Sequence, residues 1–109
     1  MRAAGRKVTE IVRQYVEALR QYGVKVERVI LYGSFAKGRP REDSDIDLVV
    51  VSESFQEMNL RERLEVLGMG AATIMKPIEA QGYTPKEVAS TSEMSFLSEV
   101  LRSGISMSV

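Results

Sequence analysis

An unbroken apolar run, Leu48-Val49-Val50-Val51, constrains the fold of this chain more than any other feature. A strand with one face in water alternates apolar and polar residues, and this run does not alternate. The run therefore predicts a central strand that is covered on both faces.

Two carboxylates stand at the start of this strand. Side chains alternate along a strand with a rise of about 3.3 Å per residue, so Asp45 and Asp47 should share one face, about 7 Å apart. Two like charges at that separation repel by about 2 kcal/mol at an effective dielectric constant near 20. A bound divalent cation would turn this repulsion into attraction, and Mg²⁺ is commonly held by one or two carboxylates and substrate phosphates.

A Gly-Ser turn precedes the two aspartates. Residues 24–32 are predicted to form a strand that Gly33 closes, and residues 34–37 are long enough for one helical turn. Such a turn directs backbone N–H groups and a partial positive charge toward the space above the strand end, where a phosphate could bind at Gly33 and Ser34. An ordinary strand-to-helix turn is the alternative.

Polar and basic residues connect the turn to the aspartates. Lys37, Arg39 and Arg41 border the same predicted site and could together meet a triphosphate, although each alone is also explained by a solvated loop. The hydroxyl of Ser44 could brace the start of the next strand.

The predicted elements before and after this region are mostly helical. Apolar residues with helical spacing predict an amphipathic helix over residues 8–22, ended by Gly23, and a second helix from Leu60. The second helix should bury Leu60, Leu64, Leu67 and Ala71, and its glycines make a break near Met69 plausible; residues 52–59 are expected to be a polar connection.

The last third of the chain predicts a strand, two helices and an edge strand. Residues 77–83 form the strand, and Thr84, Pro85 and Glu87 have the pattern of a capping box, which gives Glu87 a structural role. A final amphipathic helix covers residues 96–101, Gly104 ends it, and residues 105–109 are expected to add an edge strand.

Glu79 is the candidate third carboxylate. In the predicted strand over residues 77–83 it lies on the face opposite Ile78 and Ala80. A glutamate that simply faces solvent on a strand is the alternative.

Composition limits the available chemistry. A chain of 109 residues suits one domain over residues 1–109, and fifteen basic and fifteen acidic residues give no global field for nucleic acid, so direct nucleic-acid binding is not expected. Without cysteine or histidine, any catalysis must rely on carboxylates and metal. Neither a signal peptide nor a membrane span is visible, so a cytoplasmic location is expected.

The segment from Tyr32 to Val51 carries a resemblance to a known family. Gly33-Ser34, ten intervening residues and Asp45-Ile46-Asp47-Leu48 resemble the signature of the DNA polymerase β-type nucleotidyltransferase superfamily. The short chain resembles its minimal members, the MNT type, which are small partners of HEPN-domain proteins.

The resemblance implies a fold and a reaction. The fold would be α/β (α+β), with a mixed sheet of about four strands and helices packed mainly on one face. Asp45, Asp47 and Glu79 would hold two Mg²⁺ ions, and Gly33 and Ser34 would engage the triphosphate of ATP or another NTP. The protein would transfer AMP to a hydroxyl, such as a tyrosine of a HEPN toxin, and act as its antitoxin in a hetero-oligomer. A subunit that binds nucleotide without transferring it, or that neutralises the toxin by covering it, is the alternative.

Overall fold

The predicted central strand is at the centre of a four-stranded sheet. The computed structural model of this protein describes residues 5–37, 45–92 and 94–107. The strands are β1 (Arg28–Tyr32), β2 (Ile46–Val51), β3 (Ile78–Tyr83) and β4 (Ile105–Met107), in the order β3-β2-β1-β4. β1 is antiparallel to β2 and β4, whereas β2 and β3 are parallel. The expectation of a mixed sheet of about four strands is confirmed.

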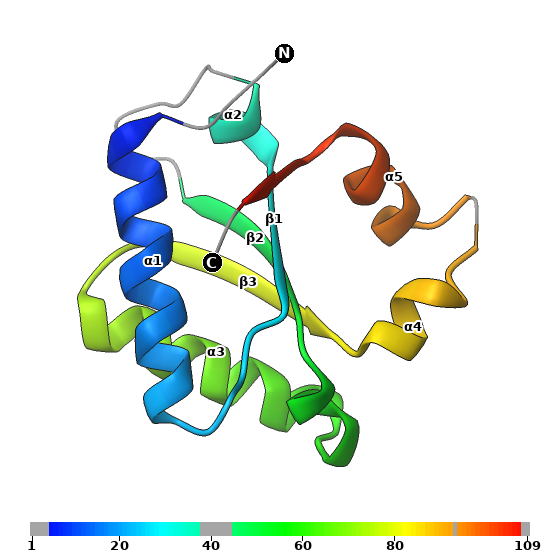
Figure 1. The fold of residues 1–109 in the computed structure, drawn as a ribbon, viewed down its shortest axis with the longest axis horizontal. Helices are drawn as coiled ribbons and strands as arrows, with labels where there is room; N and C mark the ends of the chain where they lie inside the picture. Colours follow the sequence, from blue (N-terminus) through cyan, green and yellow to red (C-terminus); the bar gives the residue numbers. More distant parts are fainter. Residues whose placement is uncertain (1–4, 38–44, 93, 108–109) are drawn as a thin grey trace.

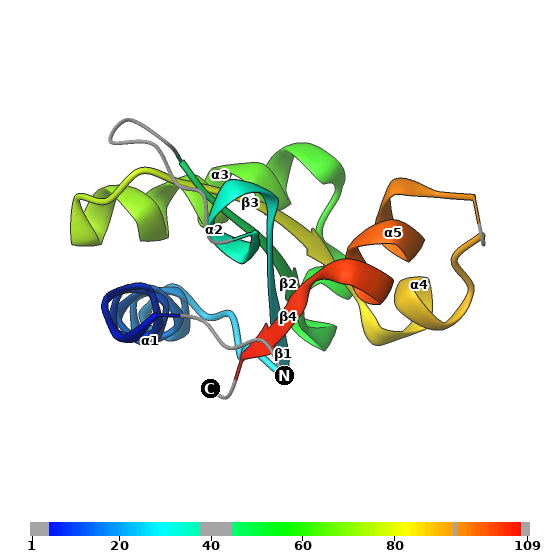
Figure 2. The same ribbon diagram turned by 90° about the horizontal axis from the view of Figure 1, so that it is seen from above.

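Helices cover the two faces of this sheet unequally. The larger apolar cluster joins one face to α1 (Arg6–Gln21) and α3 (Leu60–Ile74), and a smaller one joins the other face to α5 (Phe96–Ser103). Figures 1 and 2 show α1 and α3 on one side of the strands, and α4 (Pro85–Ala89) and α5 on the other. The central residues Leu48, Val49 and Val50 are fully buried between them, as the apolar run predicted.

The first strand is shorter than expected. It begins at Arg28, after Glu27, whose N–H still donates to the Val51 carbonyl of β2 at 2.9 Å; the backbone of Lys25 is instead bonded to side chains. The Ser52 hydroxyl donates to the Lys25 carbonyl at 2.6 Å, and the Lys25 N–H donates to the Ser54 hydroxyl at 3.1 Å. Residues 24–27 thus lie outside the strand, although Val24 is fully buried.

The connection from β2 to α3 is more structured than its polar composition indicated. It contains the 3₁₀ helix η1 (Glu53–Glu57), and the ring of Phe55 in this helix is fully buried. A Cβ atom on Gly82 would lie 2.8 Å from that ring. The absence of a side chain at Gly82 thus makes room for an aromatic anchor.

The expectations for α3 are correct only in part, because Leu67 is buried and Ala71 packs against the core, whereas the other two leucines are not buried. Leu60 and Leu64 are 72% and 50% exposed, and the residues that α3 buries are Val66, Leu67 and Gly70. The helix also continues to Ile74 without a break. Gly70 lies against α1, where a Cβ atom would be 2.7 Å from a methyl carbon of Leu19 and 3.1 Å from the Tyr15 ring. The buried face of α3 is thus formed by its second half, and the two leucines of its first half, Leu60 and Leu64, lie outside it.

The last third of the chain follows expectation. Thr84 and Glu87 form the capping box of α4 with Pro85 in its first turn, and α5 ends at Gly104 before the edge strand β4. Residues 108 and 109, expected to continue that strand, lie outside the described residues. Among the helices described, none is long and apolar enough to cross a membrane.

Candidate active site

Three neighbouring strands place three polar side chains in one row. Tyr32 of β1 is the register partner of Asp47 on β2, and Asp47 is the register partner of Glu79 on β3. Register partners project from the same face of a sheet, with Cβ atoms about 5 Å apart. This row lies on the face opposite α1 and α3, because Leu48 and Ala80, which alternate with it, belong to the larger core cluster.

Gly33 lies next to this row, directly against the Asp47 side chain. It follows β1 with a φ of +74°, a conformation that favours glycine. A Cβ atom at this position would collide with a carboxylate oxygen of Asp47. The Gly-Ser turn therefore lies directly against the Asp47 carboxylate, a proximity that sequence spacing alone did not establish.

The surroundings of Asp47 are unfavourable for its negative charge. Partial burial raises the pKa of the Asp47 carboxyl above its ordinary value, and the nearby carboxylates of Glu79 and Asp45 raise it further. Like charges gathered at a half-buried carboxylate make this position suited to a cation.

The predicted metal ligands approach one another but do not form a closed cage. Asp45 precedes β2 and is exposed, Asp47 is half-buried, and Glu79 is exposed on the edge strand β3. Over the described parts of the chain, no three acidic side chains converge closely enough to hold a metal ion by themselves. The oxygen donors nevertheless fit Mg²⁺, which often takes only one or two carboxylates and completes its shell with water and phosphate.

The predicted nucleotide-binding residues are described only in part. Gly33 and Ser34 begin α2 (Gly33–Ala36), the expected single helical turn. Lys37 caps its C-terminal end, with its N–H donating to the Gly33 carbonyl at 3.2 Å, and its side chain is exposed. Arg39, Arg41 and Ser44 lie outside the described residues.

Tyr32 is a site residue to which sequence reasoning gave no role. Burial raises the pKa of its hydroxyl above the ordinary value, and the charges of Asp47 and Glu79 raise it further. Its ring packs edge-on against Phe96 of α5, with ring centroids 5.3 Å apart. Its position directly before Gly33 was the available signal, but its neighbours on β3 and α5 depend on strand order, which the sequence does not give.

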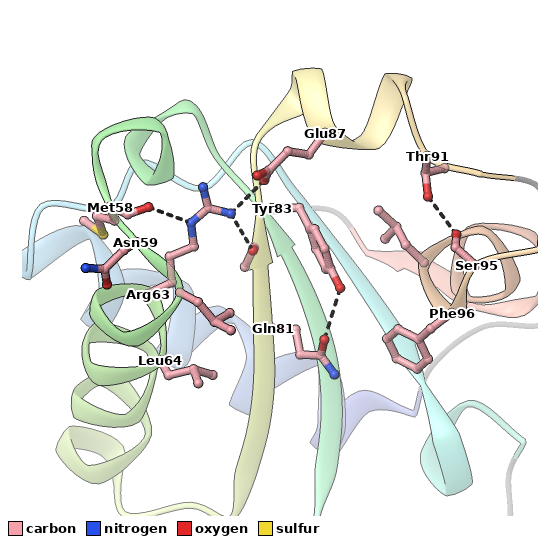
Figure 3. Close-up of a pocket in the computed structure, with 13 residues that line it drawn as sticks. Met58, Asn59, Arg63, Leu64, Gln81, Tyr83, Glu87, Thr91, Ser95 and Phe96 are labelled. Carbon is pink, nitrogen blue, oxygen red and sulfur yellow. Dashed lines mark hydrogen bonds and ion pairs between the residues drawn. The ribbon is translucent and has the colours of Figure 1, made fainter.

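A cavity of about 550 Å³ adjoins the row along β3. Gln81 and Tyr83 line it from the strand, Leu64 from α3 and Phe96 from α5, as Figure 3 shows. Gln81 and Tyr83 alternate with Gly82 and so share the face of Glu79.

The four-stranded mixed sheet and its carboxylate row define a nucleotidyltransferase-like fold. The family model described as a nucleotidyltransferase domain matches residues 12–88, from the middle of α1 to α4. The chain belongs to this nucleotidyltransferase family.

Two relatives come from Methanocaldococcus jannaschii, and both are provisionally named protein adenylyltransferases. MJ1379 is 34% identical over 89 residues, which cover 75% of this chain and 88% of that protein. MJ0604 is 37% identical over 43 residues, which cover 38% of this chain and 43% of that protein. The chain thus resembles protein adenylyltransferases, and it spans less than half the length of MJ0604.

Two solved structures share the fold. One is a crystal structure from Sulfolobus solfataricus provisionally described as a nucleotidyltransferase; its TM-score is 0.64 at 20% identity, covering 92% of this chain and 78% of that one. The other is a toxin–antitoxin crystal structure with AMP-PNP; its TM-score is 0.62 at 20% identity, covering 86% of this chain and 69% of that one.

Proposed function

We propose that this protein transfers AMP from ATP to a hydroxyl of a protein acceptor and thereby acts as the antitoxin of a HEPN-domain toxin. The observation that carries the proposal is the position of Asp47, which lies between the Gly33 turn on one side and Glu79 on the other. The names of the M. jannaschii relatives and of the toxin–antitoxin structure with AMP-PNP support it.

In this proposal each group of site residues has one task. The turn at Gly33 and Ser34 holds the β- and γ-phosphates, assisted by Lys37 and Arg39, and Ser44 steadies the start of β2. Asp45, Asp47 and Glu79 would hold two Mg²⁺ ions. When bound, the ions would neutralise charge that develops on the attacking and leaving oxygens.

The transfer is a single displacement at the α-phosphorus. The acceptor oxygen forms a bond to the α-phosphorus while the bond from that phosphorus to the bridging oxygen of the β-phosphate breaks. Pyrophosphate leaves, and the proton of the acceptor hydroxyl passes to the Glu79 carboxylate. Because Glu79 is exposed, it can release that proton to solvent.

Exposed apolar side chains support the existence of a partner. Leu60, Leu64 and Met69 on α3, Met75 at its end and Met94 before α5 are at least 47% exposed. Residues 1–109 act in this proposal as one nucleotidyltransferase domain, in a hetero-oligomer in the cytoplasm, with no membrane or nucleic-acid contact.

The test is transfer of labelled AMP. The protein is incubated with Mg²⁺, ATP labelled in the α-phosphate and the product of the neighbouring gene. We expect that product to become labelled, the label to be absent with EDTA, and Asp47→Asn to reduce transfer by about a thousandfold or more, the scale of losing a preorganised electrostatic group.

The outcomes separate the alternatives. Undiminished labelling by Asp47→Asn would remove this residue from the metal site, and full activity of Glu79→Gln would place the third acid elsewhere. Mg²⁺-dependent ATP binding without labelling of any partner would identify a regulatory subunit that senses nucleotide. Neutralisation of the toxin by Asp47→Asn would favour inhibition by covering.

A further inference from the structure

The cavity beside β3 lies where the attacking group must enter. An in-line displacement needs the attacking oxygen opposite the leaving pyrophosphate. In the proposed function the pyrophosphate is held at the end of β1, and the reacting phosphorus lies over β2. Since the strand order is β3-β2-β1-β4, the opposite side is β3 and the space beyond it.

Figure 3 shows the walls of this space. Leu64 and Phe96 stand on its two sides, and Gln81 and Tyr83 lie between them on β3. Leu64 is 50% exposed and Phe96 is 47% exposed. Apolar surface of this kind, left open to water in a concave site, is stabilised when an apolar group covers it.

Among the described residues that line the cavity, none offers an unpaired positive charge. Arg63 is the basic residue of its lining, and its guanidinium donates to the Glu87 carboxylate at 2.7 Å and to the Gly82 carbonyl at 3.2 Å. It also donates to the Met58 carbonyl at 3.2 Å. Figure 3 shows these bonds at the upper end of the cavity. A phosphate in this cavity would therefore find the basic side chain of the described lining, Arg63, already paired, which disfavours an RNA acceptor.

We propose that this cavity is the acceptor subsite, and that it takes an uncharged aromatic side chain of the protein substrate next to the hydroxyl that is modified. The proposal rests on the proposed function for the direction of attack. Leu64, Tyr83 and Phe96 provide the apolar contacts, and the amide of Gln81 lies on the same face as Glu79 to orient a polar group.

The test is binding of three small probes to the ¹⁵N-labelled full chain, followed by amide chemical shifts. N-acetyl-L-tyrosinamide represents a neutral aromatic acceptor, adenosine the nucleobase, and tetrauridylate an RNA acceptor. We expect the tyrosinamide to shift the amides of Gln81, Tyr83 and Phe96 and the other two probes to leave them in place. Shifts there from adenosine or tetrauridylate instead, or from none of the probes, would overturn the proposal.

Two matched variants on α3 test whether Leu64 forms a wall of the acceptor subsite. Leu64→Glu places a carboxylate in the cavity and should weaken tyrosinamide binding by about tenfold or more. Met69→Glu is the control, because Met69 lies on the same helix, is 47% exposed and does not line the cavity. Equal binding by the two variants would contradict the assignment.

The two proposals can fail separately. Mg²⁺ with ATP should shift the amides of Gly33 and Ser34 equally in the wild type, Leu64→Glu and Met69→Glu. If Mg²⁺ with ATP does not shift these amides in the wild type, the proposed function is wrong. If the shifts are absent only in Leu64→Glu, the nucleotide occupies the cavity and the acceptor assignment is wrong.

Discussion

Gly33 combines a left-handed backbone with contact to a carboxylate, and other residue types satisfy neither condition well. Its φ is +74°, and its missing side chain leaves the space that the Asp47 carboxylate occupies. Gly23 offers a comparison, because its φ is +91° and nothing lies within 4 Å of a Cβ atom there.

The two glycines should therefore respond differently to alanine. Gly23→Ala should lower the free energy of unfolding by about 1 kcal/mol, the cost of a left-handed conformation, and leave AMP transfer unchanged. Gly33→Ala should lower the free energy of unfolding by the same amount and also displace the Asp47 carboxylate. AMP transfer should therefore fall by about tenfold or more. Thermal unfolding and the labelling assay measure both effects, and equal transfer by the two variants would show that the contact does not matter.

Single residues also show which features of the site can be predicted from the sequence. The side chains of Asp47 and Glu79 were placed on the correct faces because strand alternation is a local property. The roles of Tyr32 and Phe96 were not predicted, since their contact joins β1 to a helix more than sixty residues later.

Among the secondary-structure elements, α3 contains two glycines with opposite roles. Gly68 has nothing within 4 Å of a Cβ position, whereas Gly70 lies against the fully buried Leu19 and Tyr15 of α1. The sequence shows only two helix-weakening residues. It cannot show that one of them permits close contact between helices.

Substitution by alanine should change the free energy of unfolding in opposite directions at these two glycines. Gly68→Ala should raise the free energy of unfolding by about 0.5–1 kcal/mol through helix propensity. Gly70→Ala should lower it by about 1 kcal/mol, because the added methyl overpacks the contact between α1 and α3. Urea unfolding of both variants measures the difference, and stabilisation by Gly70→Ala would contradict the close contact.

An ion pair connects α3 to α4. Arg63, with a side chain 12% exposed, lies 2.7 Å from the Glu87 carboxylate, which is 44% exposed. This hydrogen bond holds the pKa of Glu87 below its ordinary value. The ion pair therefore stabilises the fold fully at a pH above the ordinary pKa of glutamate. This stabilisation is lost as the pH falls through the lowered pKa of Glu87 in the folded protein.

Glu87→Gln tests this dependence while keeping the α4 capping box, because glutamine also serves at that position. At pH 7 the variant should be less stable by about 0.5–1 kcal/mol, after allowance for solvent screening. The difference from the wild type should shrink as the pH drops below about 4.5. Glu62→Gln, at the matching position of the α3 capping box, is the control. A difference that stays constant down to pH 2 would exclude the ion pair as its cause.

For the whole molecule, the apolar run predicted the central strand and the family resemblance implied the mixed sheet, but neither indicated the outward turn of Leu60 and Leu64. A stripe of leucines on a helix is equally consistent with a core face and with a cavity wall. Helical spacing cannot distinguish the two, because the choice depends on which other elements lie nearby.

Ligand binding should stabilise the folded domain. At ten times its dissociation constant, Mg²⁺-ATP should add about 1.4 kcal/mol to the free energy of unfolding and raise the Tm by about 5 °C. Asp47→Asn should show no such rise, and its Tm without ligand should equal or exceed that of the wild type because a repelled charge is gone. A ligand-induced rise in Asp47→Asn would remove this carboxylate from the binding site.

The pairing of Tyr32 with Asp47 and of Asp47 with Glu79 also bears on how the protein folds. The first pair joins antiparallel strands that are close in sequence, whereas the second is parallel and requires α3 to cross between its strands. Pairings between distant segments close larger loops and form more slowly. During refolding, amides of β1 and β2 should therefore gain protection from hydrogen exchange before those of β3, and the third carboxylate should join the site last.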